Sequence, residues 1–359
     1  MQLPPPLHGA SQSNSNIANS SFINSNFDVR IVNLQFAKSL SELRRFTLKK
    51  VLKAFKYCFV IISVARRFNP DLVYFTLSPN GFAFYRDALY VFIIKILRIK
   101  IVFHLHGKGI KKYCESSYFK RVLFKKVFQN ADVICLTNKL TKDIENVSSA
   151  QPFIVPNGIP IQKESLNTII RNNCIPMILY LSNYKESKGI LILIDALTIL
   201  KAQGLNFNTR LVGGPSDLSI ETLKNYIKNK KIEKNVEVVG PLYDDKKYSE
   251  YKTADIFVFP TYYFNEAFPL VNLEAMQFGL PVISTDEGGI SEVVINGQTG
   301  FVIEPKNSHE LVNKLALLIN DKKMREEMGI RGKDMFFQHY TLQHFEKNLK
   351  EVFETILNK

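Results

Sequence analysis

Two glutamates with seven residues between them mark the part of this sequence that is best suited to chemistry. Glu266 follows an apolar run, and Glu274 lies shortly after Pro269. Proline favours the first position of a helix, so we expect a helix that begins at Pro269 and places Glu274 one turn inside it. The first amides of such a helix, those of Leu270 and Val271, have no partner within the helix, and the helix dipole lies behind them.

A helix start of this kind binds anions, and a diphosphate suits it. Glu274 is placed to accept hydrogen bonds from the vicinal hydroxyls of a ribose, and Glu266 is able to do the same for a sugar. The competing interpretation is a buried helix–strand crossover that carries two incidental acids. The sequence has no Asp-x-Asp pair, so this chemistry does not require a bound metal.

The elements that must position these residues form a repeating order of strands and helices. Short runs that are apolar on both faces predict parallel strands covered by helices. In the first half, strands are expected at 29–34, 72–77, 101–106, 132–137 and 153–156, with helices at 47–67 and 84–98. In the second half, strands are expected at 177–182, 209–214, 236–240, 255–260 and 281–285, with helices from 190, at 218–230 and at 270–279.

This order predicts an α/β protein of two doubly wound domains, which bind ligands at the carboxyl ends of their strands and would face a central cleft. The predicted domains cover residues 1–162 and 174–340. The helix at 341–359 is expected to pack back on the first domain and to act in the hinge. A doubly wound domain normally begins with a strand, yet this sequence begins at the turn that would follow it. We therefore expect that about ten residues are missing before this turn, and that they carry the central first strand of the domain.

The formal charge of +14 is concentrated in the first half, where residues 44–126 hold 19 Lys and Arg against three acids. These basic residues alternate with large apolar ones and accompany no nucleic-acid motif, so an anionic membrane surface is favoured over nucleic acid. The alternative is a solvated face whose apolar residues turn into the core. No apolar stretch reaches the length of a membrane span and no signal peptide is present, so a cytoplasmic location is expected. The four cysteines are expected to be buried thiols.

The segment from Pro260 to Ile303 resembles the donor-binding segment of glycosyltransferase family 4, whose members are retaining enzymes with the two-domain GT-B fold. The resemblance rests on Glu-x7-Glu with Phe-Pro-Leu-Val between, followed by Glu-Ala-Met, Gly-x-Pro-Val, Gly-Gly and Gly-x-x-Gly. It extends over nearly the whole chain, because Pro4–Gly9, Phe103–Gly107 and Val155–Ile159 resemble the first glycine loop, the histidine segment and the end of the first domain.

The resemblance implies a role for each matching residue. Glu274 would hold the nucleotide ribose, Glu266 would contact the donor sugar, and Lys188 would neutralise the departing diphosphate. Backbone amides from Phe268 through Pro269 and Leu270 to Val271 would bind sugar and phosphate. Gly9 would let the backbone approach the diphosphate. His106 would lie near the reacting sugar, although His104, on the same face of its strand, competes for that role.

One position departs from the family pattern. Many members have an arginine five residues before the lysine, where this chain has Asn183. The loss of one charge-assisted contact costs about 1.5–3 kcal/mol if nothing replaces it. Lys185 is the first candidate to compensate, and Lys108 is the second.

The expected activity is transfer of a sugar from a nucleotide diphosphate sugar, with a UDP-sugar favoured over a GDP-sugar and no further cofactor. The expected acceptor is a lipid-linked or oligosaccharide precursor of a bacterial surface polysaccharide, reached by peripheral contact with the anionic inner membrane at its cytoplasmic face. The alternatives are a catalytically impaired homologue that binds nucleotide sugars, a nucleotide-sugar epimerase and, on charge alone, a nucleic-acid protein.

Overall fold

A computed structural model describes residues 1–6, 9–37, 42 and 47–359. The chain forms two compact units, of which the first combines Met1–Gly158 with Leu342–Lys359 and the second spans Ile159–Thr341. The boundaries predicted from the sequence were 162, 174 and 341. Each unit is built around one parallel sheet with helices on both faces, so the predicted α/β class with two doubly wound domains is confirmed.

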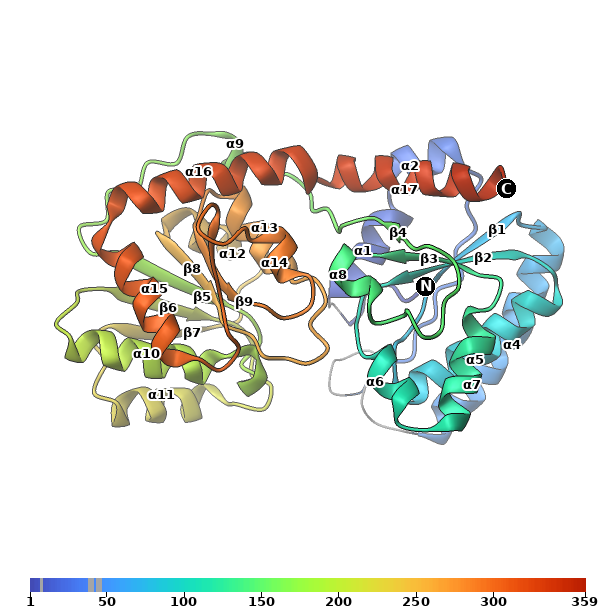
Figure 1. The fold of residues 1–359 in the computed structure, drawn as a ribbon, viewed down its shortest axis with the longest axis horizontal. Coiled ribbons are helices and arrows are strands. Elements are labelled where there is room, and N and C mark those ends of the chain that lie inside the picture. Colours follow the sequence, from blue (N-terminus) through green and yellow to red (C-terminus); the bar gives the residue numbers. More distant parts are fainter. Residues whose placement is uncertain (7–8, 38–41, 43–46) are drawn as a thin grey trace. The chain divides into compact units, whose positions relative to one another are not determined.

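Unit 1 contains a four-stranded sheet in the order β1-β2-β3-β4. Its strands are β1 (Leu72–Thr76), β2 (Lys100–Leu105), β3 (Asp132–Cys135) and β4 (Phe153–Ile154). Its helices are α1 (Gly9–Ala18), α2 (Ser21–Asn26), α4 (Leu48–Phe68), α5 (Gly81–Ile96), α6 (Ile110–Glu115), α7 (Tyr118–Phe128), α8 (Asn138–Thr141) and α17 (Leu342–Leu357). Helices α4, α5 and α7 lie on one side of this sheet and α17 lies on the other (Figure 1).

Unit 2 contains a six-stranded parallel sheet in the order β10-β9-β8-β5-β6-β7. Its strands are β5 (Met177–Leu181), β6 (Asn208–Val212), β7 (Val236–Gly240), β8 (Ile256–Phe259), β9 (Val282–Thr285) and β10 (Gly300–Ile303). Its helices are α9 (Lys163–Leu166), a 3-10 turn η1 (Glu186–Lys188), α10 (Ile190–Ala202), α11 (Ile220–Asn229), α12 (Asp244–Thr253), α13 (Leu270–Gln277), α14 (Ile290–Val293), α15 (Ser308–Asn320) and α16 (Lys322–His339). The strand order reverses between β5 and β8, which is where open α/β sheets bind ligands.

Two sequence predictions are wrong, and one alternative fails for part of a helix. Residues 29–34 form no strand, and Val32 and Leu34 bond through their backbones to Met1 rather than to a described strand. The alternative in which the apolar residues of the basic segment turn into the core fails for two residues of α4, because Phe55 is 56% exposed and Phe59 is 73% exposed. Cys174 is exposed, whereas the other three free cysteines are buried as expected.

The described helices include none that combines the length and the hydrophobicity needed to cross a bilayer.

The C-terminal helix is an integral part of unit 1. Phe345, Leu349 and Phe353 repeat at helical spacing and are buried against Val102 and Ile134, which lie on one face of the sheet. The predicted apolar stripe of this helix is thereby confirmed, and the last residues of the chain close the core of its first unit.

Leu349→Ala is expected to destabilise unit 1 by about 3 kcal/mol, since it removes a fully buried side chain and leaves a cavity. Hydrogen–deuterium exchange under native conditions would measure the loss as faster exchange in α17 and β2. The matched control is the exposed neighbour Glu351→Ala, which should change little. Equal effects of the two substitutions would contradict the packing of this helix.

Candidate active site

Lys188 and Glu266 meet at the point where the strand order of unit 2 reverses. Lys188 lies in the turn η1 that follows β5, and Glu266 lies in the loop that follows β8. The Lys188 ammonium donates to Oε2 of Glu266, which also accepts from the hydroxyl of Thr261 at 3.4 Å. Because β5 and β8 are neighbours and parallel, their carboxyl ends bring the two side chains together.

A close backbone approach holds the lysine turn against this loop. Gly189 has a φ of +81°, and a Cβ at this position would lie 2.0 Å from the carbonyl oxygen of Pro260. The amide of Tyr262 donates to the carbonyl of Ser187 at 2.8 Å, which ties the two segments together. Glycine is required here both for the left-handed backbone and for the absence of a side chain.

The loop of Glu266 is supported from its other side by Gly288 and Gly289. Gly288 has a φ of +57°, and a Cβ there would lie 2.3 Å from the carbonyl oxygen of Glu266. The amide of Gly289 donates to the carbonyl of Ala267 at 2.8 Å. The Gly-Gly pair of the motif therefore fixes the backbone that carries Glu266.

Glu274 has two partners from α12, which the sequence analysis did not identify. Lys247 Nζ lies 2.7 Å from Oε1, and the hydroxyl of Tyr251 donates to Oε2 at 2.8 Å. Burial opposes the charge of Lys247, but the attraction and the hydrogen bond of Glu274 outweigh it, so the pKa of Lys247 is raised. The carboxylate oxygens keep lone pairs for a further donor, because a carboxylate accepts about four hydrogen bonds.

Helix α13 starts where the predicted range 270–279 starts, but Pro269 is not its first helical residue. Pro269 is the N-cap, with extended backbone, and the helix starts at Leu270. In the part of the chain that the structure describes, no backbone carbonyl accepts from the amides of Leu270 or Val271, which leaves both donors available to an anion. Phe268 is buried, and its ring contacts that of Tyr340.

Lys185 and Lys188 both contact the ring of Tyr263. Their ammonium groups lie 4.1 Å and 4.8 Å from the ring centroid of Tyr263. Asn183, where the family pattern has an arginine, is exposed and lies two residues before Lys185. The structure thus places a second cation beside Lys188, while the compensating role of Lys185 stays a prediction, as does that of Lys108.

The two histidines of unit 1 differ in their surroundings. His104 is fully buried in β2, and its Nδ1 lies 2.7 Å from the hydroxyl of Tyr74. Burial and the neighbouring His106 lower the pKa of His104 well below its usual value, so this ring is neutral. His106 follows the strand and is half-buried, with its ring centroid 4.1 Å from that of His104. The ring of His106 is less buried than that of His104, but both of its ring nitrogens are buried.

The other predicted residue of unit 1 is Gly9, which is exposed at the start of α1 and has no atom within 4 Å of a built Cβ. Space for a close ligand is therefore present, although Leu7 and His8 lie outside the described residues. The roles of Gly9 and His106 stay predictions.

Sequence reasoning missed Lys247, Tyr251 and Tyr263. Lys247 and Tyr251 lie four residues apart, on one face of α12, which is the single signal that the sequence offered for them.

Comparison with known proteins decides what kind of site this is. Residues 167–335 match the family described as Glycosyl transferases group 1, a range that includes every candidate residue from Asn183 to Glu274. This chain is a glycosyltransferase whose second unit is similar to the group 1 family. Its two parallel sheets are those of the GT-B fold, as predicted.

The relatives of this glycosyltransferase include enzymes of capsular polysaccharide and lipopolysaccharide synthesis and D-inositol 3-phosphate glycosyltransferases. The chain is 28% identical over 290 residues to the capsular polysaccharide biosynthesis glycosyltransferase CapM of Staphylococcus aureus, covering 75% of this chain and 71% of CapM. The apo structure of the lipopolysaccharide outer core galactosyltransferase WaaB has the same fold, with a TM-score of 0.73 and 17% identity over 99% and 98% of the two chains. Anabaena HepE, solved in complex with UDP, gives a TM-score of 0.68 and 20% identity over 85% and 82% of the chains.

Two glycines of this glycosyltransferase offer a matched test of the backbone approach at the site. Gly189→Ala should prevent the turn from seating on Pro260 and destabilise unit 2 by more than 2 kcal/mol. Gly204→Ala, at a φ of +79° with open space around it, should cost only the conformational penalty of about 1 kcal/mol. Thermal melts of both variants would measure the difference. Equal losses would show that the contact with Pro260 does not constrain the site.

Proposed function

We propose that this glycosyltransferase moves a sugar from a nucleotide diphosphate sugar to an acceptor hydroxyl and retains the anomeric configuration, as the resemblance to family 4 implies. The proposal rests mainly on two ion pairs, Lys188–Glu266 and Lys247–Glu274. Their glutamates come just before and just after the start of α13 at Leu270. Cations and free amides suit a diphosphate, and carboxylates suit the hydroxyls of a ribose and a sugar.

The bound donor then competes for the ion pairs and hydrogen bonds that the side chains of the site make with one another. Glu274 receives the ribose hydroxyls while Lys247 and Tyr251 hold its orientation. The diphosphate lies against the amides of Leu270 and Val271, and attracts Lys188 away from its partner. Glu266 is thereby released toward the sugar. A UDP-sugar is the favoured donor, which the UDP complex of the structural neighbour HepE supports.

The transfer step needs no additional cofactor. The bond between the anomeric carbon and the diphosphate oxygen breaks, and the acceptor oxygen bonds to the same face of the carbon. The acceptor proton passes to the departing phosphate oxygen. Lys188, with Lys185 beside it, stabilises the charge that develops on that phosphate, and His106 lies by the reacting sugar.

The acceptor is proposed to be carried by a lipid, in the synthesis of a bacterial capsule, O-antigen or exopolysaccharide. Three helices of unit 1 expose large apolar side chains that a water-soluble surface does not require. Apart from Ile96 at the end of α5, these are Leu48, Leu52, Phe55 and Phe59 of α4, Phe82, Tyr85 and Leu89 of α5, and Tyr118 and Phe119 of α7. We call these nine side chains the apolar surface of unit 1.

Lysines accompany this apolar surface. On α4 the apolar residues recur at positions 48, 52, 55 and 59, and exposed Lys49, Lys53 and Lys56 form the adjacent stripe. An amphipathic helix with this pattern lies in the interface of an anionic bilayer. Helices of a parallel sheet run against the strands, so the first turns of α5 and α7 lie at the carboxyl ends of the strands, where ligands bind. Peripheral contact with the cytoplasmic face of the inner membrane follows from this proposal.

Glu274→Ala is expected to weaken UDP binding at least tenfold, since charge-assisted hydrogen bonds contribute about 1.5–3 kcal/mol. Calorimetric titration with UDP and GDP would measure this and identify the base. Glu233→Ala removes an exposed carboxylate on the loop before β7 and serves as the control. Wild-type protein that binds neither nucleotide would refute the proposed donor site. Protein that binds UDP yet never turns over a UDP-sugar with any acceptor would point to the impaired homologue instead.

Replacing Phe55 and Phe59 together by serine should weaken binding to vesicles that contain anionic phospholipid by a factor of ten or more, because each buried Phe contributes about 1.5–3 kcal/mol. Added salt should weaken the wild-type protein further. Vesicle co-sedimentation provides the measurement. The control is Ile330→Ser, which removes an exposed apolar side chain from α16 in unit 2. Unchanged sedimentation of the double variant would exclude the apolar surface as the membrane contact.

A further inference from the structure

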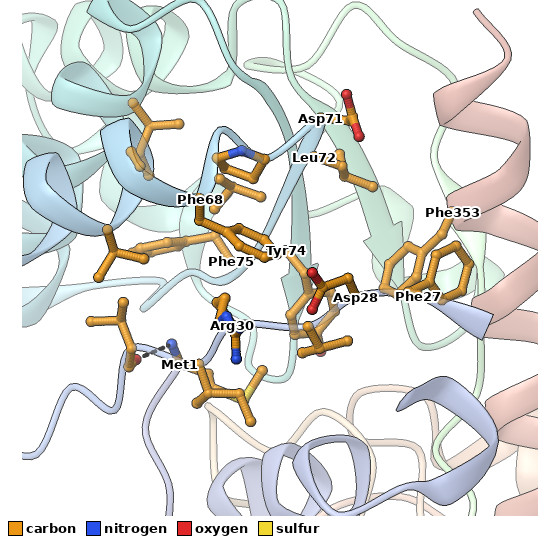
Figure 2. A pocket seen from close by; sticks show the side chains of 18 of the residues that line it. Met1, Phe27, Asp28, Arg30, Phe68, Asp71, Leu72, Tyr74, Phe75 and Phe353 are labelled. Atoms are coloured by element: carbon orange, nitrogen blue, oxygen red, sulfur yellow. Dashed lines mark hydrogen bonds between the residues drawn. The ribbon is translucent and has the colours of Figure 1, made fainter. Parts of the chain in front are cut away.

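An apolar cavity of about 420 Å³ lies beside the sheet of unit 1. Two stretches of chain border it, residues 27–32 and residues 68–75, as Figure 2 shows for Asp28, Arg30, Leu72, Tyr74 and Phe75. Its two faces are apolar as well. One face is lined by Ile61, Val64, Ala65 and Phe68 of α4, and the other by Phe27 together with Phe353 and Leu357 of α17.

The backbone at the end of this cavity is already paired as in a parallel sheet. The Met1 amine donates to the carbonyl of Val32 at 3.2 Å, and the amide of Leu34 donates to the carbonyl of Met1 at 2.9 Å. These two bonds, on either side of Asn33, form the pattern of a parallel pair. A residue placed before Met1 would lie opposite Val32, and the fifth such residue would lie opposite Asp28.

The other border of the cavity has the same register. Asn14 Nδ2 donates to the carbonyl of Gln2 at 3.0 Å and to Oγ1 of Thr76 at 3.1 Å, so Gln2 is level with the last residue of β1. Among the described strands, β1 pairs with β2 alone, which leaves its second edge facing the cavity. A buried strand edge without partners is costly, because each backbone amide and carbonyl needs a hydrogen bond.

The charged form of the Met1 amino group is unfavourable in these apolar surroundings. It is enclosed beside apolar side chains (Figure 2), and burial lowers its pKa to about 6, with Asp87 raising it and Arg86 lowering it. A peptide bond at this position would remove the charge and keep the hydrogen-bonding nitrogen.

We infer that the cavity is the slot of a further parallel β-strand, and that a segment directly preceding Met1 in the full polypeptide fills it. About five of its residues lie inside the slot, opposite residues 28–32 on one border and residues 70–74 on the other. Its side chains are apolar on both faces, since α4 covers one face and α17 the other, and proline is absent from its centre. The strand continues into Met1–Leu3, which precede α1 and its first residue, Gly9.

The first test is the intact mass and the N-terminal sequence of the protein purified from the organism that makes it. The 359 residues have a mass of 41.2 kDa. We expect a larger mass, with at least five additional residues before Met1, most of them apolar. A mass of 41.2 kDa overturns the proposal.

The second test adds the strand to the 359-residue chain. An N-terminal extension of alternating Val and Ile, five residues long, should raise the midpoint of thermal unfolding by at least about 5 °C and slow hydrogen exchange at Val73, Tyr74 and Phe75 at least tenfold. The matched control has the same length but is made of Gly, Ser and a central Pro, which cannot pair on both edges.

Equal midpoints and equal exchange for the two extensions would overturn the proposal. So would a native protein of 41.2 kDa whose slot retains an apolar small molecule in native mass spectrometry, because the occupant would then be a ligand. UDP binding to unit 2 is a separate readout, so failure of the strand leaves the proposed donor site standing.

Discussion

The contact between the turn after β5 and the loop after β8 is the constraint on which the candidate active site depends. Gly189 lies against the carbonyl of Pro260, at a distance that no other residue type allows. This contact places Lys188 beside Glu266 at the point where the sheet reverses its strand order. The glycine pair at Gly288 supports the same loop from the other side. Two side chains of opposite charge are thus fixed by backbone packing and remain available to a ligand that competes for each of them.

The sequence predicted most of unit 2 because its apolar runs are short and its glycines are tied to motifs. The strands before Lys188 and Glu266 lie within a residue or two of their predicted limits, and Glu274 lies in the first turns of α13. The sequence could not reveal Lys247, since α12 reaches Glu274 only through tertiary packing. Pro269 was expected at the first helical position, but it is the N-cap, one residue earlier. The sequence pattern does not distinguish these two positions.

Unit 1 was predicted less well, for two physical reasons. Helix α4 has apolar residues on two faces, one with Cys58, Ile61 and Ala65 and one with Phe55 and Phe59, and periodicity does not reveal which face packs on the sheet. The second reason is that a strand depends on its neighbours. The run at 29–34 has the composition of a strand, but its backbone pairs with Met1 alone among the described residues that flank it.

The two units differ in net charge. The net positive charge of the chain lies in unit 1, in a region that also carries the apolar surface, whereas acids balance the basic residues of unit 2. Unit 2 holds its site lysines in pairs with glutamates, so its cations are oriented rather than freely solvated. The proposed function fits this division, since a sugar donor needs a shaped site and the proposed lipid-borne acceptor needs a surface that reaches the membrane.

Hydrogen–deuterium exchange of the wild-type protein with and without UDP tests the central claim most directly. The account predicts slower exchange on UDP binding in two stretches of unit 2, the turn at 186–189 and the segment at 262–274, with the largest change at Leu270 and Val271. Protection that spares both stretches while UDP is bound would contradict it, because the nucleotide would then occupy a site that these residues do not build.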